Sequence, residues 1–378
     1  MKLSTIAFAT VAAAGSGVFG GHLEKRVVGG SSAASSGSYT FVADIVVGSS
    51  DGKAGACTGA LISPTVVVTS AGCVADSVSN KAVSVNTVIV GQGSASSVLG
   101  NNTVSLSEAV AKSKYVFAKE VHVHPGYNSI AHTDNIAVVV LTQPLASADQ
   151  TAKVISKPGS AAKTAYTAVG WGSTAAQAGG DNFPSAGPFA SQLQQVQLSV
   201  GSKSACTDIW DSYANLTNSL CLNPVKSSAN VCNGDGLLVK TANDKSVGIA
   251  GLLNIVGDSD GVPAETCTSS SATDFFTTFT NYISWITQIT SLQESDFVSK
   301  ATFTFDTVSA SGNDKDNEEE AEGSLSDDEE EEKSGSHSSH DHESSLDSEE
   351  SSESSSAAST MLGLASGSLA AMLIASLF

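Results

Sequence analysis

The feature that most constrains the fold is a series of short apolar runs between residues 27 and 292, separated by clusters of Gly, Ser, Asn and Asp. Examples are TFVADIVVG, ALISPTVVVTS, NTVIVG, NIAVVVL, AYTAVGWG and VGIAGLLNIV. Val196, Leu198 and Val200 alternate with polar residues, as in a strand with one buried face. Many short strands with turn residues between them are typical of an antiparallel sandwich or barrel. The sequence therefore predicts an all-β body.

One segment of this body has a helical period instead. Tyr282, Trp285, Ile286 and Ile289 recur at spacings of three and four residues, which places them on one face of an α-helix. We expect this helix to close the body.

The amino-terminal end has the pattern of a secretory signal peptide. Residues 1–20 contain one Lys, then an apolar run, then small residues. The alternative is a short membrane helix, but the apolar run is too brief to cross a bilayer. Residues 21–26 then read as a short propeptide, because Lys25-Arg26 forms a dibasic processing site before Val27.

The carboxyl-terminal end has the layout of a GPI-attachment signal. Residues 360–378 are apolar and uncharged, and a stretch of small polar residues precedes them. A retained membrane anchor is the alternative, although such an anchor normally carries Lys or Arg after the span. We expect lipid attachment among Ser352 to Ser356.

The net charge of −20 is concentrated in one segment. Residues 313–353 hold 18 acidic and 2 basic residues, a charge of −16, whereas the rest of the chain holds 20 acidic and 16 basic residues. This balance argues against a nucleic-acid partner, because phosphate binding requires a basic surface.

Residues 310–359 are Ser-rich and acidic, with few residues that could form a core, so they predict a disordered, extended stalk. His337, His340 and His342 could bind a divalent metal weakly, but a solvated stalk that contains His is the simpler interpretation because no spacing defines a coordination geometry. Residues 293–309 connect this stalk to the body.

Six cysteines in a secreted chain predict three disulfides, with many possible pairings: Cys57, Cys73, Cys206, Cys221, Cys232 and Cys267. A metal site is a weaker interpretation, because the chain has no CxxC pair. Asn101 and Asn215 begin glycosylation sequons. We expect no cofactor.

Seven segments, in order, resemble landmarks of the trypsin-like serine protease family. They are Arg26 followed by Val27-Val28-Gly29-Gly30, CTGALISPTVVVTSAGC (57–73), HPGYNSIAHTDNIAVVVLTQPL (124–145), VGWG (169–172), LQQVQLSV (193–200), CNGD (232–235) and NYISWI (281–286). The resemblance implies two six-stranded antiparallel barrels with a C-terminal helix. It also implies the disulfide pairs Cys57–Cys73, Cys206–Cys221 and Cys232–Cys267.

The resemblance also implies that the catalytic residues are replaced. The family uses a Ser nucleophile, a His base and an Asp that orients the His. Gly72 stands at the His position, Asn135 at the Asp position and Gly236 where Ser is expected. A neighbouring Asp134 would orient nothing without the His. We expect no catalytic residues at these three positions.

Other groups could be proposed as a base, namely His122, His124 and His132. His124 matches a non-catalytic landmark of the family, and surface positions explain the other two more simply. The sequence has no recognisable carboxylate pair and no metal-ligand spacing.

The predicted substrate cleft is also altered. Asn230 stands where trypsin-like enzymes place an acid at the base of the specificity pocket. The resemblance aligns Gly251-Leu252-Leu253 with the edge that pairs with substrate, so that Leu253 would crowd the mouth of the pocket. One functional pair is retained, because cleavage after Arg26 would free Val27 to pair with Asp235.

These observations predict a protease homologue without catalysis, displayed on the cell surface by the lipid and the stalk. It would bind a secreted or cell-wall protein and could inhibit a secreted hydrolase. Two alternatives stay open: an endopeptidase with a non-standard catalytic arrangement, and a structural surface glycoprotein.

Overall fold

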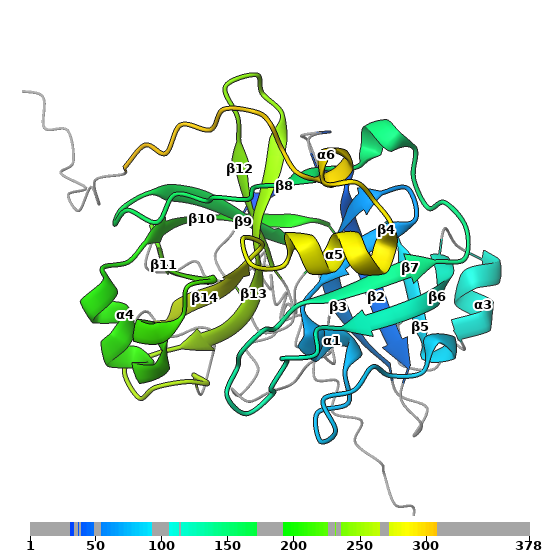
Figure 1. Ribbon diagram of the computed structural model, residues 1–378, viewed down its shortest axis with the longest axis horizontal. Helices are drawn as coiled ribbons and strands as arrows, with labels where there is room; N and C mark the ends of the chain where they lie inside the picture. Colours follow the sequence, from blue (N-terminus) through cyan, green and yellow to red (C-terminus); the bar gives the residue numbers. More distant parts are fainter. Residues whose placement is uncertain are drawn as a thin grey trace, which may run out of the picture. The chain divides into compact units, whose positions relative to one another are not determined.

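The computed structural model describes residues 31–33, 37, 39–48, 54–92, 106–112, 115–171, 192–225, 231, 236–264 and 272–307. Figure 1 shows two groups of strands, coloured blue to teal and green to yellow, with the helix α5 beside both. The predicted all-β architecture is confirmed, and the strands fall in the apolar runs, in most of which consecutive residues are buried rather than alternate ones.

The first barrel is closed by six antiparallel strands in the order β2-β3-β4-β7-β6-β5. They are β2 (Val42–Gly48), β3 (Ala54–Ser63), β4 (Val66–Thr69), β5 (Val88–Gly91), β6 (Tyr115–Val123) and β7 (Ala137–Leu141). Closure removes the exposed edges that an open sheet would leave.

The second barrel also has six strands, and β9 closes it by pairing with both β10 and β12. Its strands are β9 (Ala165–Gly170), β10 (Gln194–Val200), β11 (Ser219–Pro224), β12 (Leu237–Thr241), β13 (Val247–Gly257) and β14 (Thr273–Thr278). Two short strands join this sheet, β1 (Ser31–Ser32) on β10 and β8 (Lys153–Val154) in parallel on β13. In β10, Val196, Leu198 and Val200 are buried and the residues between them are more exposed, as the alternation predicts.

The predicted terminal helix is α5 (Ile283–Thr290), with Tyr282 at its start and Ile286 buried beneath it. The structure adds short helices that the sequence pattern did not predict: α1 (Ala71–Val74), α3 (Leu106–Lys112), α4 (Lys203–Ile209) and α6 (Glu294–Phe297). Single 3₁₀ turns occur at Val85–Thr87, Ala148–Gln150 and Asp211–Asn215. Helices of one or two turns carry too few apolar positions to show a period.

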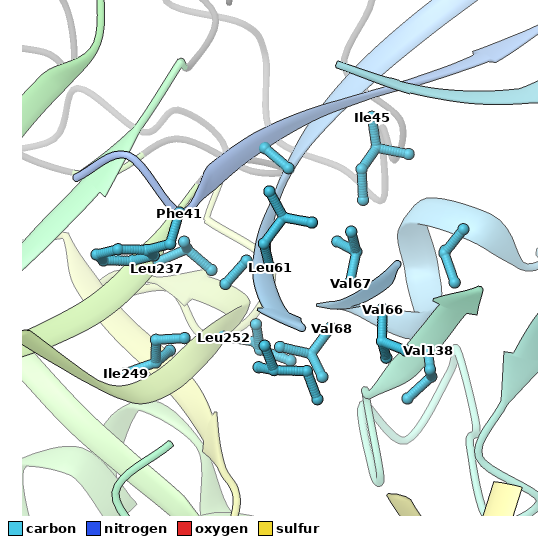
Figure 2. Packing of buried hydrophobic residues seen from close by; sticks show 14 of the residues in the cluster. Phe41, Ile45, Leu61, Val66, Val67, Val68, Val138, Leu237, Ile249 and Leu252 are labelled. Atoms are coloured by element: carbon cyan, nitrogen blue, oxygen red, sulfur yellow. The ribbon is translucent and has the colours of Figure 1, made fainter. Parts of the chain in front are cut away.

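One core extends between the two barrels. Figure 2 shows Phe41 of the first barrel lying beside Leu237 of the second, with Leu61, Ile249 and Leu252 close by. All five are at most 3% exposed. This shared core fixes the two barrels against each other. The candidate site lies where they meet.

The segment after α5 packs on the body as well. Phe297 of α6 is fully buried, and Phe303 and Phe305 pack against the core of the second barrel. The backbone of Asn243 donates to Thr302 at 3.0 Å, and that of Ala165 donates to Asp306 at 3.1 Å. Figure 1 shows this segment in orange, running past β8 and β12. Residues 293–307 therefore pack on both barrels, because Phe297 belongs to the core that the barrels share, and Phe303 and Phe305 pack against the core of the second.

Among the described residues, no helix is both long and apolar enough to cross a membrane.

Candidate functional site

Gly72 lies in α1, immediately after β4. The disulfide between Cys57 of β3 and Cys73 anchors this turn to the first barrel. All four residues of α1 are buried. The backbone N–H of Gly72 donates a hydrogen bond to Oδ1 of Asn135 at 2.9 Å. Positions 72 and 135 are therefore in direct contact, although neither residue carries an ionisable side chain.

Asn135 precedes β7 and is 3% exposed. While its Oδ1 accepts from Gly72, its Nδ2 donates to Oδ1 of Asn254 at 2.9 Å and to the backbone oxygen of Asn254 at 3.3 Å. Nδ2 of Asn254 donates in turn to the carbonyl of His132 at 2.8 Å. We call these four residues the amide network. It joins the first barrel to β13 of the second through groups that do not titrate.

Gly236 lies just before β12, and its carbonyl accepts from the backbone N–H of Leu253 at 2.9 Å. A Cβ added to Gly236 would lie 2.8 Å from Cγ1 of Val231 and 3.5 Å from Cβ of Leu253. A side chain at this position would therefore require Val231 to shift. The position expected for the nucleophile has no hydroxyl and is closely packed.

These three positions carry none of the groups that the resemblance predicts for acyl transfer, namely a Ser hydroxyl, a His base and an Asp carboxylate. A hydroxyl needs a nearby base to become a nucleophile, and the base needs a carboxylate that orients it and stabilises its protonated form. The residues at these positions offer a backbone N–H, a neutral amide and a glycine instead. An amide cannot stabilise an imidazolium as a carboxylate does.

The three histidines proposed as substitute bases have other surroundings. His122 lies 3.0 Å from Glu120, and Nδ1 of His124 accepts from the backbone of Gly126 at 3.2 Å. The His132 ring faces Trp210 edge to face, with ring centroids 6.3 Å apart. The partners of His122 and His124 are therefore a carboxylate and a backbone amide, and neither is a hydroxyl that an imidazole could activate.

His124 belongs to a cluster at the junction of the barrels and α5. Its ring packs edge to face on Tyr282 and Trp285, with centroids 5.0 and 4.9 Å away. Burial lowers the pKa of His124, and the charge of Asp134 partly opposes this. The imidazole is therefore held towards its neutral form by packing.

Asp134 forms its hydrogen bonds within this cluster. The hydroxyl of Tyr282 donates to Oδ1 of Asp134 at 2.6 Å, and Asn218 contacts both groups. Burial raises the pKa of Tyr282, and the bond to Asp134 raises it further. Asp134 thus ties the loop before β7 to α5.

The alignment of Gly251-Leu252-Leu253 with a substrate-pairing edge needs a correction. Leu252 and Leu253 are each 1% exposed and pack in the two cores. A register shift between Leu253 and Ile255 then places Asn254 next to Asn135. Leu253 therefore does not crowd a pocket mouth, because its side chain is in the core of the second barrel.

Two buried polar residues were not predicted from the sequence: Asn254 of β13 and the fully buried Asp274 of β14. Asn254 could not be found because 119 residues separate it from Asn135. Asp274 left one signal, a charge in a strand that otherwise holds Thr and Phe.

The remaining predicted residues divide into two groups. The pairs Cys57–Cys73 and Cys206–Cys221 are confirmed, and Asn215 is exposed at the end of a 3₁₀ turn. Outside the described residues lie Lys25, Arg26, Val27, Asn101, Asn230, Cys232, Asp235, Cys267, the stalk histidines and Ser352 to Ser356. Within the described ranges, no three His, Cys, Asp or Glu residues come together as a metal site.

Comparison with known proteins agrees with this architecture. The family model described as Trypsin matches residues 27–286. Transmembrane protease serine 11G of Mus musculus is 26% identical over 181 residues, which cover 46% of this chain and 39% of that protein. The chain thus matches about two fifths of the length of this relative.

Proposed function

The chain belongs to the trypsin family, and on that premise we propose that it is a non-catalytic member that binds a secreted or cell-wall protein at the cell surface. The observation that carries the loss of catalysis is the amide network. Gly72, Asn135 and Asn254 are bonded to one another through neutral groups where the family needs a base and its acid.

The rim of the site supports a role in binding. Val78 is 90% exposed and Ile130 is 88% exposed, on two loops that flank Gly72 and Asn135 in the sequence. These loops are bonded to each other, because Ser129 donates from its backbone to Asn80 at 3.0 Å and from its hydroxyl to Ser77 at 2.9 Å. Apolar side chains presented on loops that are held in place suit a protein interface.

The proposed surface location rests on the sequence, with support from the disulfides. The two disulfides in the described residues favour an oxidising, extracellular compartment. We propose attachment by the GPI lipid alone. Cleavage after Arg26 would free Val27 to pair with Asp235 and so order the second barrel; amino-terminal sequencing of the secreted protein should then begin at Val27.

Loss of catalysis is tested with the purified protein that begins at Val27. Incubation with casein should give no cleavage, and a fluorophosphonate probe should give no labelling, under conditions in which an active trypsin reacts with both. Labelling at one unique Ser would overturn the proposal in favour of an endopeptidase with a non-standard site.

Binding is tested by capturing partners from the secreted proteins of the source cells. The wild type should retain a specific protein, and the double substitution Val78→Asp and Ile130→Asp should lose it. Val225→Asp is the matched control, because Val225 is 37% exposed but follows β11 on the other barrel. If only background proteins are captured, the structural-glycoprotein alternative is favoured.

A further inference from the structure

A cavity lies where the two barrels meet the terminal segment, and none of its lining residues belongs to the candidate site. Its volume is about 510 Å³, within the range of about 300–1,000 Å³ that is usual for small-molecule sites. The lining residues fall within four segments, 37–41, 149–153, 244–247 and 299–301. The last segment lies beyond residue 286, where the match to the family model ends. One wall of the cavity therefore comes from outside the family domain.

Hydrogen bonds hold the walls of this cavity together. On one side, the backbone N–H of Ser299 donates to the carbonyl of Val154 at 2.9 Å. On the other, the backbone N–H of Asn243 donates to the carbonyl of Thr302 at 3.0 Å. In Figure 1 the orange terminal segment runs from α6 across the hairpin of β12 and β13. Because both sides are bonded, a ligand would enter a cavity that is already formed.

Three lysines line the cavity, each from a different segment: Lys153, Lys245 and Lys300. All three are exposed, and Nζ of Lys153 donates to the carbonyl of Ser295 at 2.9 Å, which leaves it two further protons to donate. In the part of the chain that the structure describes, the ion pairs are elsewhere, at Glu120. None of the three ammonium groups is therefore paired there with a carboxylate.

The rest of the lining is mixed. Asp149 and Asp244 offset two of the lysines, so that the lining keeps one net positive charge. Oδ1 of Asp244 already accepts from the backbone and the hydroxyl of Ser246, at 2.9 and 2.6 Å. The hydroxyls of Thr151 and Ser299 stand beside small apolar side chains. Such a lining suits a sugar, whose hydroxyls exchange hydrogen bonds and whose C–H groups pack on apolar side chains.

We propose that this cavity binds a sugar that carries a phosphate or sulfate group, at a second site that the proposed function does not use. The anionic group lies among the three lysines, because ammonium groups form charge-assisted hydrogen bonds with its oxygens. The sugar ring lies against the hydroxyls and the apolar side chains. A neutral sugar lacks the charge, and an inorganic anion leaves the hydroxyls unused, so neither half should bind as tightly as the whole.

Isothermal titration calorimetry of the whole secreted protein tests this proposal. The probes are glucose 6-phosphate and glucose 6-sulfate, with glucose and inorganic phosphate as the two halves. We expect at least one ester to bind at a single site, more tightly than either half, and to bind less tightly as salt is added. A trisaccharide that ends in the same ester distinguishes the two sources of such a group, because it should bind more tightly than the free sugar only if the natural ligand is a glycan end.

Lys245→Gly removes one ammonium group without straining the turn, because Lys245 has a φ of 69°, in the left-handed region that favours Gly. Lys163→Gly is the matched control, since Lys163 is also exposed with a φ of 69° but does not line the cavity. Lys245→Gly should weaken binding of the ester at least about fivefold, and Lys163→Gly should bind it as the wild type does.

Thermal melting checks that both variants are folded. Three results would overturn the inference: no binding of either ester by the folded wild type, inorganic phosphate binding as tightly as the esters, or equal binding by Lys245→Gly and Lys163→Gly. The casein, fluorophosphonate and capture experiments test the proposed function separately, because they do not involve this cavity.

Discussion

Replacing Asn135 by Asp introduces the residue type that the family resemblance implies at this position, and we expect it to destabilise the protein. Nδ2 of Asn135 donates to two oxygens of Asn254, at 2.9 and 3.3 Å. A carboxylate cannot donate, so Asn135→Asp would place a buried negative charge against two acceptors. Only the bond from the backbone of Gly72 would be kept.

The expected loss follows from these contacts. A buried acceptor left without its donor costs about 1–3 kcal/mol, and a buried charge without a cation adds to this. If the amide of Asn254 rotates to donate to the new carboxylate, it gives up its bond to the carbonyl of His132. We therefore expect the free energy of unfolding at pH 7 to fall by roughly 3 kcal/mol.

Urea unfolding, followed by tryptophan fluorescence, measures this loss. Asn128→Asp is the matched control in the same loop, because Asn128 is exposed and its Oδ1 only accepts, from the backbones of Ile130 and Ala131. A carboxylate can accept these bonds equally well, so this variant should change the stability by less than about 0.5 kcal/mol. If Asn135→Asp is as stable as Asn128→Asp, the described network does not contribute as argued.

Three further outcomes are expected. Asp274→Asn should raise the free energy of unfolding at pH 7. Because burial raises the pKa of Asp274, the stability of the wild type falls as the pH rises above the usual value of 3.8. The urea midpoints of the two proteins should therefore converge near pH 4. Phe297→Ala should lower the unfolding free energy by about 3–5 kcal/mol in urea titrations, because Phe297 is fully buried, whereas a loss below about 1 kcal/mol would contradict the packing of the terminal segment. Gly236→Ser should lower the melting temperature, since its Cβ overlaps Val231, and should still not react with a fluorophosphonate; labelling of the new Ser would show that a base is in reach.

Much of the fold could be predicted from local patterns. The alternation in β10 and the helical spacing around Ile286 depend only on neighbouring residues, and both are confirmed. The pairs Cys57–Cys73 and Cys206–Cys221 needed the family resemblance, because spacing alone does not choose among pairings. The short helices, such as α4, have too few turns to leave a pattern.

The candidate site could be predicted only in part. Gly72, Asn135 and Gly236 could be singled out from the sequence, because each lies in or beside a segment that resembles a landmark of the family. It misplaced the part of β13 that meets them, since a one-residue shift in a strand exchanges the side chains on its two faces. The shift after Leu253 turns Asn254 towards Asn135, and no local pattern reports it.

The sequence by itself therefore determined the strand content, the family and the residue types at positions 72, 135 and 236, because these depend on residue identity and short-range periodicity. Tertiary structure alone decided what these residues contact. Barrel closure and strand register bring Gly72, Asn135 and Asn254 into one neutral network, and they enclose Asp274 between β11 and β13. Whether a buried polar side chain finds a hydrogen-bond partner depends on strands that are distant in the sequence. The packing of the barrels decides which of these strands become its neighbours.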